Sequence, residues 1–330
     1  MNSMLKNSLV FVVAILAVGL LSPVLENSIN AYWFSILIYA GINITLAVSL
    51  NLVNGTTGQF SIGHAGFMSV GAYVSAALSF FYFNKVQILG VPEWMSVYLL
   101  FGVSLLCGGI AAAVLGYLVG LPSLRLKGDY LAIVTLGFGE IVRVVLLNID
   151  VVGAARGLPG IPKITNFTWV YAVAVVCLFF CYRLRQSPHG RALVAIREDE
   201  MAAQLMGVDT TRYKVMAFSF GAFFAGVAGG LFAHYLTYIN PKMFDFNRSF
   251  EMIIMVVLGG MGSMSGAVFA AIFLTVLKEA LRPLQEMTGV DLRMIIYSLV
   301  LIGMMLSRPS GLMGMKEIWE LKIFRKKKKV

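Results

Sequence analysis

Hydrogen-bonding side chains and glycines gather in residues 51–77, a segment that lies between long apolar runs. The segment reads NLVNGTTGQFSIGHAGFMSVGAYVSAA, and its polar side chains include those of Asn54, Thr56, Thr57, Gln59, Ser61 and His64. At membrane depth an unpartnered polar group costs several kcal/mol unless protein or a water-filled cavity surrounds it. Glycines also interrupt the segment at five positions. It is therefore predicted to be a broken membrane helix beside a transport pathway.

A second glycine-rich break, GGMGSMSG at residues 259–266, resembles the first. Paired breaks are typical of transporters with internal repeats, in which the pathway runs between them. Small residues at these positions also permit close helix packing, so Ser263 is open to either interpretation. His64 is interpreted as a hydrogen-bonded residue at a helix start, in preference to a proton carrier or a ligand.

One charged pair lies inside an apolar run. Glu140 and Arg143 fall midway along residues 129–148 and three positions apart, so they share a helix face and can neutralise each other. The pair would then serve helix packing. Alternatively it lines the pathway, since intramembrane charges are costly and often functional. The candidate pathway residues are Asn54, Gln59, Ser61, His64, Glu140, Arg143 and Ser263.

The composition of the 330-residue chain defines its class. Hydrophobic residues make up 59% and charged residues 13%, whereas about a quarter of the residues in a soluble domain are charged. The chain is therefore predicted to be an all-α, polytopic integral membrane protein with Gly-rich broken or re-entrant segments. Its net charge of +10 does not indicate nucleic-acid binding, because the basic residues concentrate in two regions. Three cysteines and three histidines show neither a disulfide framework nor the spacing of a metal site.

Apolar runs long enough for a bilayer, about 17 to 25 residues, predict about ten transmembrane helices. The runs are residues 9–25, 31–53, 60–83, 95–118, 129–148, 169–184, 214–239, 249–260, 266–281 and 291–307. The eighth and ninth are short and bounded by glycines, so one re-entrant hairpin is an alternative to two crossings. The first follows Lys6 but lacks a convincing cleavage site for a signal peptide, so it is counted as a span.

Positive charge sets the predicted orientation, because cytoplasmic loops carry an excess of Lys and Arg. Basic residues cluster in residues 182–214 and again in the tail, which ends RKKKKV. Six spans precede the first cluster and four separate it from the second, so both termini and the loop are expected on the cytoplasmic side. Residues 1–310 form the predicted membrane domain. Residues 311–330 form a basic cytoplasmic tail that would meet anionic lipid headgroups.

The loop at residues 182–214 contains a predicted amphipathic helix, residues 190–206, which Pro188 precedes and Gly207 ends. Its apolar positions are Leu193, Ile196, Ala203 and Leu205. These side chains would either pack on the membrane domain or insert into a groove of a partner protein. Periodicity alone does not separate the two alternatives.

Five motifs, in order along the chain, carry a resemblance to a known family. They are NGTTGQFSIGHAGFMSVGAYVSA (54–76), RLKGDYLAIVTLGFGEIVR (125–143), GLPGIP (157–162), AIREDEMAAQLMGV (195–208) and VLGGMGSMSGAV (257–268). Together they resemble the LivM-type permease of branched-chain amino acid ABC importers. The resemblance implies a bacterial inner-membrane subunit for leucine, isoleucine and valine. It also implies a second, homologous permease, two cytoplasmic ATPases and a periplasmic amino-acid-binding protein as partners.

The resemblance also implies a role for the loop. Permeases of ABC importers carry a Glu-Ala-Ala motif, followed after three residues by Gly, whose helix docks in a cleft of the ATPase. Ala202, Ala203 and Gly207 match this spacing, whereas Met201 stands at the acidic position. This departure resembles the variant of the branched-chain subgroup. The expected ATPase-coupling residues are Arg197, Glu200, Ala202, Ala203 and Gly207.

Other classes of function are less well supported by the residues. The chain lacks the GxxxxGK[ST] sequence, so ATP would be used by a partner and no cofactor is expected here. The scattered histidines supply no enzymatic constellation. A secondary transporter or channel would need coupling groups of its own, and the sequence shows one intramembrane acid, Glu140, beside a neutralising neighbour. Related permeases import urea, short-chain amides or other amino acids, so these substrates remain alternatives.

Overall fold

The computed structural model describes residues 3–82, 92–124, 126, 128–282, 293–308, 310–314 and 317, and these are almost entirely helical. The helices are α1 (Ser3–Ser28), α2 (Ala31–Asn51), α3 (His64–Ala77), α4 (Glu93–Ser123), α5 (Asp129–Leu147), α6 (Phe167–Gln186), α7 (Pro188–Glu198), α8 (Glu200–Leu205), α9 (Thr210–Leu236), α10 (Phe246–Gly259), α11 (Met264–Ala280) and α13 (Arg293–Ser307). In lipid, backbone N–H and C=O groups find no water, so they must form hydrogen bonds within the protein. An α-helix forms these hydrogen bonds within its own segment. The predicted all-α architecture is confirmed.

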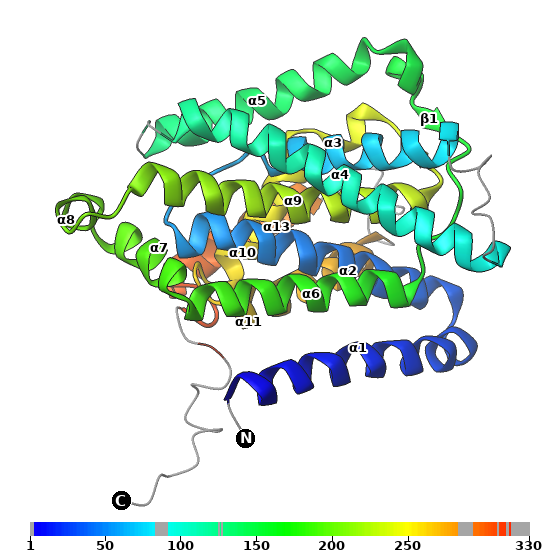
Figure 1. The fold of residues 1–330 in the computed structure, drawn as a ribbon, viewed down its shortest axis with the longest axis horizontal. Coiled ribbons are helices and arrows are strands. Elements are labelled where there is room, and N and C mark those ends of the chain that lie inside the picture. Colours follow the sequence, from blue (N-terminus) through cyan, green and yellow to red (C-terminus); the bar gives the residue numbers. More distant parts are fainter. Residues whose placement is uncertain are drawn as a thin grey trace, which may run out of the picture.

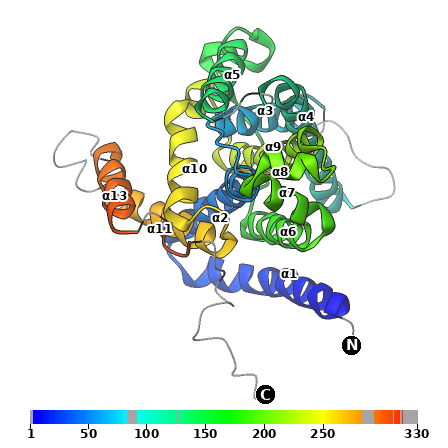
Figure 2. The ribbon, with the colours of Figure 1, turned by 90° about the vertical axis from the view of Figure 1, so that its left-hand side faces the viewer.

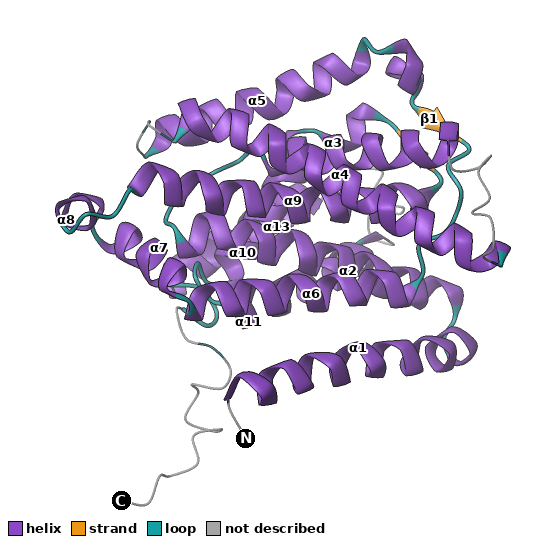
Figure 3. Cartoon of the chain, in the orientation of Figure 1, coloured by secondary structure: helices purple, strands orange, loops and turns teal. Residues whose placement is uncertain are grey.

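The long helices lie side by side along the longest dimension of the molecule (Figure 1). Helix α9 packs against α3 and α4, and α2 packs against α6, α9 and α11. Helix α1 lies at one edge of the bundle against α6, and α5 lies at the opposite edge against α3. Helices α7 and α8 project from one end, here called the loop end. A two-stranded ribbon of β1 (Leu158–Pro159) and β2 (Tyr238–Ile239) lies towards the other end (Figure 3).

Glycines bring α3, α4 and α9 into close contact. A Cβ atom on Gly71 of α3 would lie 2.2 Å from the backbone of Gly226 in α9, and one on Gly108 of α4 would lie 2.7 Å from the Gly71 carbonyl oxygen. Lipid tails are as apolar as the helices, so the hydrophobic effect does not drive helices together in a membrane. Van der Waals packing between small residues therefore supplies much of the attraction. These three helices form the tightly packed centre of the bundle.

Six of the described helices are long and apolar enough, by length and composition, to cross a membrane. They are Ala31–Thr56, His64–Tyr82, Met95–Ser123, Tyr130–Leu147, Phe167–Gln186 and Thr210–Leu236. Helices α10, α11 and α13 contain 14, 17 and 15 residues. At about 1.5 Å per residue, none of these three reaches the roughly 30 Å of a hydrocarbon core. A polytopic bundle is therefore established, and the count of ten crossings remains a prediction.

The segment 249–281 forms two packed helices joined by a turn, an arrangement that both predicted forms share, so the choice between two crossings and a re-entrant hairpin stays a prediction. Helices α10 and α11 pack against each other and are joined by the short turn at residues 260–263. In the view along the bundle, α10 lies across the direction of α6 and α9 (Figure 2).

The carboxyl-terminal part of the described chain returns to the loop end. The Leu312 N–H donates to the Leu258 carbonyl oxygen at 2.9 Å, and the Met313 N–H donates to that of Gly259 at 3.2 Å. Helix α1 also begins on this side (Figure 1). Residues 311–314 and 317 thus pack on the helical bundle, although the sequence places them in a separate tail. The basic run 325–329 lies outside the described residues.

Candidate functional site

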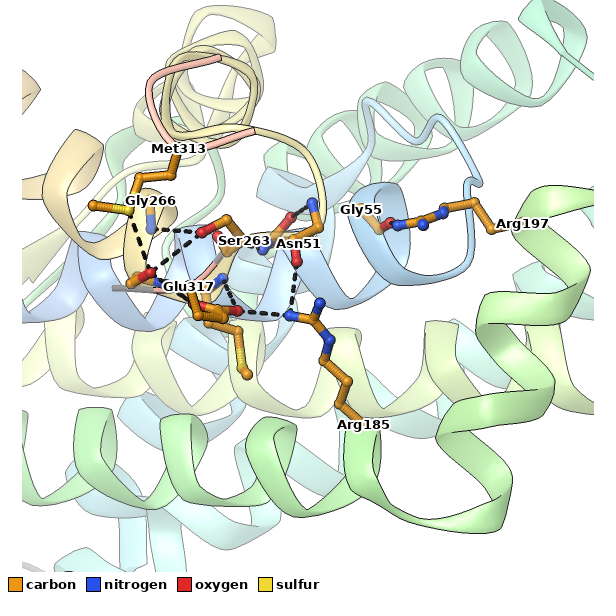
Figure 4. Close-up of polar contacts among 11 residues, drawn as sticks. Asn51, Gly55, Arg185, Arg197, Ser263, Gly266, Met313 and Glu317 are labelled. Carbon is orange, nitrogen blue, oxygen red and sulfur yellow. Dashed lines mark hydrogen bonds and ion pairs between the residues drawn. The ribbon is translucent and has the colours of Figure 1, made fainter. Parts of the chain in front are cut away.

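The two glycine-rich breaks meet at the loop end, where one side chain joins them (Figure 4). The Asn51 amide, at the end of α2, is 1% exposed. It accepts a hydrogen bond from the Gly262 N–H at 2.9 Å and donates one to the Ser263 carbonyl oxygen at 3.0 Å. An asparagine amide carries both an acceptor and donors, so it can satisfy both backbone groups at once. The turn between α10 and α11 is thereby fixed to α2.

Glycine makes this contact possible. A Cβ atom on Gly55 would lie 2.3 Å from the Gly262 nitrogen. Gly262 itself has a φ of +95°, a conformation that side chains disfavour. Because the two breaks touch in this structure, a pathway that ran between them would be closed here.

Residues 57–63 form the non-helical part of the first break, and the predicted pathway residues Asn54, Ser61 and His64 lie in it or next to it. The Asn54 amide accepts from the Ser61 N–H at 3.2 Å and donates to the Ser61 carbonyl oxygen at 3.3 Å. The buried Ser61 hydroxyl has no hydrogen-bond partner among the described residues. His64 begins α3 with its Nε2 atom 2.9 Å from the Ser49 hydroxyl, as expected for a hydrogen-bonded residue at a helix start.

Ser263 and Gln59, also predicted for the pathway, have different surroundings. The Ser263 hydroxyl caps α11 by accepting from the Gly266 N–H at 3.1 Å, and the residue is fully buried. A structural role therefore accounts for it. Gln59 is 9% exposed, and its side chain lines a cavity beside α7.

Two arginines at the start and within the loop donate hydrogen bonds to the breaks (Figure 4). Arg185, in the last turn of α6, donates from Nη1 to the Gly262 carbonyl oxygen at 2.9 Å. Arg197, near the end of α7, donates from Nη1 to the Gly55 carbonyl oxygen at 3.0 Å. Hydrogen bonds from a charged donor are shorter and stronger than neutral ones. Arg185 thus connects the end of α6, just before α7, to the second break, and Arg197 connects the last turn of α7 to the first.

A buried carboxylate that was not predicted from the sequence completes the cluster. Glu317 is 2% exposed and accepts from Arg185 Nη1 at 2.6 Å. It also accepts from the Met264 and Ser265 N–H groups, each at 3.0 Å, and from the Ser265 hydroxyl at 2.6 Å. Both N–H groups belong to the first turn of α11, where the helix dipole favours an anion. Glu317 is one of two acids in a basic tail, and the sequence around it carries no local signal of such a partner.

The predicted pair of Glu140 and Arg143 is formed. Arg143 Nε and Nη2 each lie 2.7 Å from Glu140 Oε2, and the two side chains are 26% (Arg143) and 36% (Glu140) exposed. Among the described residues, each finds its partner on α5, so the pair does not link two helices of this chain. Intramembrane charges almost always face protein or a water-filled cavity. This surface of α5 is therefore expected to face a protein partner or a pathway.

A second acid, Glu251, falls within the predicted span 249–260, and like Glu140 it is paired. Glu251 of α10 pairs with Arg248 at 2.9 Å and with Lys278 of α11 at 2.8 Å, and its side chain is 12% exposed. Arg248 also donates to the Asn43 side-chain oxygen of α2 at 3.0 Å. The triad joins three helices and carries a formal charge of +1. The spacing of Arg248 and Glu251, three residues apart, is the sequence signal that indicates it.

The predicted loop helix at residues 190–206 is in fact two helices. Helix α7 ends at Glu198, and Asp199 has extended backbone angles, with φ of −154° and ψ of 107°. The Asp199 carboxylate accepts from the Met201 and Ala202 N–H groups at 2.9 and 3.0 Å. Aspartate is among the strongest residues at a helix N-cap. It therefore starts α8 as a separate helix.

Burial separates the apolar side chains of the loop. Leu193, Ile196 and Ala203 are at most 5% exposed, so α7 and one face of α8 pack on the bundle. Leu205 is 87% exposed, and it belongs to a set of three exposed apolar side chains, here called the apolar tip. The apolar tip consists of Met201, Leu205 and Met206. The small residue Ala203, expected in a partner's cleft, is instead enclosed by this chain.

The remaining predicted coupling residues, Glu200, Ala202 and Gly207, lie in α8 or directly after it. The Glu200 carboxylate pairs with Lys214 Nζ of α9 at 2.7 Å. Gly207 follows α8 with a φ of +83°, in agreement with its predicted role as a helix terminator. Ala202 is exposed. Among the described residues, no three His, Cys, Asp or Glu side chains gather to hold a metal ion.

An apolar helical bundle, interrupted by polar breaks that connect to a loop helix with an exposed apolar tip, defines the class of a polytopic membrane permease. The comparison with known families is more specific. The chain belongs to the family described as the permease component of the branched-chain amino acid transport system, which matches residues 32–306.

Individual relatives agree with this family. The chain is 37% identical to the high-affinity branched-chain amino acid transport system permease protein LivM of Salmonella typhimurium and to that of Escherichia coli K12, over 83% of this chain and 68% of each relative. It is 25% identical to the corresponding LivH protein of Escherichia coli K12, over 83% of this chain and 91% of the relative. No solved structure matches the chain.

We predict that Asn51→Leu destabilises the protein. Leucine has a similar size but leaves the Gly262 N–H and the Ser263 carbonyl buried without this partner, at about 1–3 kcal/mol for each unsatisfied group. The purified permease should therefore unfold at a lower temperature. The matched control is Asn148→Leu, which removes an exposed side-chain hydrogen bond to the Val144 carbonyl oxygen. Equal melting temperatures for the two variants would contradict the role of Asn51.

We also predict that Glu140→Ala harms the protein more than the double variant of Glu140→Ala with Arg143→Ala. The single variant leaves an unpaired charge at membrane depth, whereas the double variant removes both charges. Protein level in the membrane and uptake should be measured together. If the single and double variants reach the same level, the stranded-charge argument is wrong. A double variant that assembles normally but does not transport would place the pair in the pathway.

Proposed function

We propose that this chain is a membrane-spanning permease subunit of a binding-protein-dependent ABC importer, and that it forms part of the pathway for leucine, isoleucine and valine. Membership of the branched-chain family and the names of its LivM and LivH relatives support this proposal. A second homologous permease would complete the pathway, and a periplasmic amino-acid-binding protein would deliver the substrate. Two cytoplasmic ATPase subunits would hydrolyse ATP.

The observation that carries the proposal is the connection between the apolar tip and the two helix breaks. The apolar tip is the exposed apolar surface of α8 and its C-cap residue, whereas Leu193 and Ile196 pack α7 on the bundle. Arg197 then links α7 to the Gly55 carbonyl oxygen. A partner bound to the apolar tip would therefore be connected to the first break through a short series of contacts. An ATPase needs such a connection in order to drive transport.

The same contacts suggest how the pathway would open. An ATPase that changed conformation would displace α8 and α7 together. Arg185 and Arg197, which hold the Gly262 and Gly55 carbonyl oxygens, would transmit that displacement to both breaks. The breaks form an element with two arrangements, in contact or apart, whose balance a partner can shift. Separation would require the Asn51 hydrogen bonds to be broken.

The second permease would cover the outer surface of α5. Glu140 and Arg143 lie there, and their side chains are 36% and 26% exposed in the single chain. A protein partner or the shared pathway would remove this pair from lipid, which is where intramembrane charges are found.

The proposed location is the bacterial inner membrane, with the loop end in the cytoplasm. The loop carries the excess of positive charge that is typical of cytoplasmic segments. The start of α1 and Glu317 lie at the same end, so both termini would be cytoplasmic. Reporter fusions at each terminus test this orientation, and a periplasmic reporter at either end would contradict it.

Transport by the assembled complex is the direct test of the proposed function. Proteoliposomes with this chain, the second permease, both ATPases and the binding protein should show ATP-dependent uptake of radiolabelled leucine, isoleucine and valine. The chain alone should show none, because it lacks a GxxxxGK[ST] sequence. Urea and fructose should be compared, since a fructose import permease of Rhizobium meliloti is 28% identical over 54% of this chain. ATP-driven uptake by the lone chain, or uptake of urea or fructose in preference, would reject the proposal.

Coupling through the apolar tip predicts that Leu205→Asp uncouples the complex. A charge at this 87% exposed position removes an apolar contact with the ATPase, and a buried leucine side chain is worth about 1.5–3 kcal/mol. ATPase retention on pull-down should fall about tenfold or more and uptake should fall with it, while the membrane level stays normal. The control Gln186→Asp adds a charge at an exposed position away from the tip. Wild-type ATPase retention and uptake by Leu205→Asp would exclude the tip from docking.

A further inference from the structure

A cavity of about 280 Å³ lies at the loop end, beside the contacts that join the breaks. It lies between the non-helical residues 57–60, residues 126 and 128 before α5, helices α7 and α8, and the start of α9. Its lining residues are Thr57, Gly58, Gln59, Phe60, Leu126, Gly128, Leu131, Ile196, Arg197, Glu200 and Lys214. Sites for drug-sized ligands measure about 300–1,000 Å³, so this cavity suits a smaller molecule.

Two buried polar side chains in the cavity have unused hydrogen-bonding capacity. Gln59 is 9% exposed, and among the described residues its side-chain amide has no hydrogen-bond partner. Lys214 is 2% exposed, and within the described chain its ammonium, which carries three N–H donors, is paired with Glu200 alone. Buried polar groups in native proteins nearly always have partners. Both side chains therefore provide donors for an anionic group in the cavity.

The other walls of the cavity complement a positive charge and an apolar group. The Glu200 contacts with Lys214 and Thr210, at 2.7 and 3.5 Å, both use Oε1. Within the described residues its Oε2 atom accepts no hydrogen bond, so it can receive one from a ligand. Leu131 and Ile196, at 2% and 4% exposure, supply the apolar surface. The cavity thus places an acceptor, donors and an aliphatic wall around one space.

We propose that this cavity binds one free aliphatic α-amino acid from the cytoplasmic side. Its carboxylate accepts from Lys214 and Gln59, its ammonium donates to Glu200, and its side chain contacts Leu131 and Ile196. Of the three charged side chains in the lining, Lys214 pairs with Glu200, and Arg197 pairs with Glu198 outside the cavity. The Lys214–Glu200 pair that faces the ligand is neutral, which matches a zwitterion. This inference rests on the proposed function, because the product of import is released at this end.

The position of the cavity indicates what binding would do. Ile196 and Arg197 belong to α7 and Glu200 to α8, while Gln59 belongs to the first break. An amino acid held among them restrains the helices that connect the apolar tip to the breaks. The cavity would thereby make transport sensitive to the amount of product already in the cytoplasm.

Equilibrium binding of radiolabelled L-leucine to the permease–ATPase complex in nanodiscs, without the binding protein, tests the site. Saturable binding is expected, and Gln59→Met should weaken it about tenfold, equivalent to about 1.4 kcal/mol, because a hydrogen bond to a charged group is lost. Leu126→Trp should weaken binding similarly by filling the cavity from a 39% exposed position. The control Gln186→Met makes the same substitution outside the cavity and should leave leucine binding unchanged.

Ligands that carry one of the two charges extend the test. The acid 4-methylpentanoate lacks the ammonium and 3-methylbutylamine lacks the carboxylate, so each should bind more weakly than leucine. The inference is overturned if the wild-type complex shows no saturable leucine binding, or if Gln59→Met and Leu126→Trp both bind leucine as the wild type does. Leucine uptake by the same complex with its binding protein separates the two proposals. Uptake without binding at this cavity overturns the site alone, whereas absence of uptake overturns the proposed function.

Discussion

The buried Asn51 amide joins the end of α2 to the turn between α10 and α11 through two hydrogen bonds. Leaving either backbone group unbonded at this depth would cost about 1–3 kcal/mol, so the amide determines how the two breaks fit together. The same turn receives Arg185 at the Gly262 carbonyl oxygen, and Ser263 caps α11. The ends of α2, α6, α10 and α11 are therefore positioned by one small network, on which the proposed coupling geometry depends.

Charged side chains in this bundle are accommodated in three ways. Glu317 is almost fully enclosed and is satisfied by Arg185, a hydroxyl and two backbone N–H groups. Glu251 is shared between two cations from different helices. Glu140 pairs on its own helix and stays partly exposed. A buried charge is tolerated when it is paired and hydrogen-bonded, so the first two are complete within this chain. The third needs a surrounding that the described residues do not provide.

The bundle combines a close-packed centre with a polar network at one end. Helices α3, α4 and α9 touch through glycines, where a shift of the backbone would lose many packing contacts at once. The breaks touch at Gly55 and Gly262 alone among these contacts and are otherwise joined by a few hydrogen bonds, which water can replace at modest net cost. A conformational change driven from α8 would therefore open the network before it disturbed the centre. This difference is consistent with a permease that alternates between two states around a fixed core.

The sequence by itself determined the features that depend on local spacing and hydropathy. These are the helical membrane class, the two polar breaks, the ion pair of Glu140 with Arg143, and a loop helix that ends at Gly207. Tertiary structure alone decided that Asn51 reaches Gly262, 211 residues away, and that Glu317 returns to cap α11. It also decided that Ala203 faces the bundle while Leu205 is exposed. The division of the loop helix at Asp199 is, in contrast, a local N-cap that the sequence interpretation missed. Hydropathy and periodicity report which residues leave water or share a helix face. They carry no information on which distant backbone groups a buried side chain will satisfy, because that choice is made only when the helices pack.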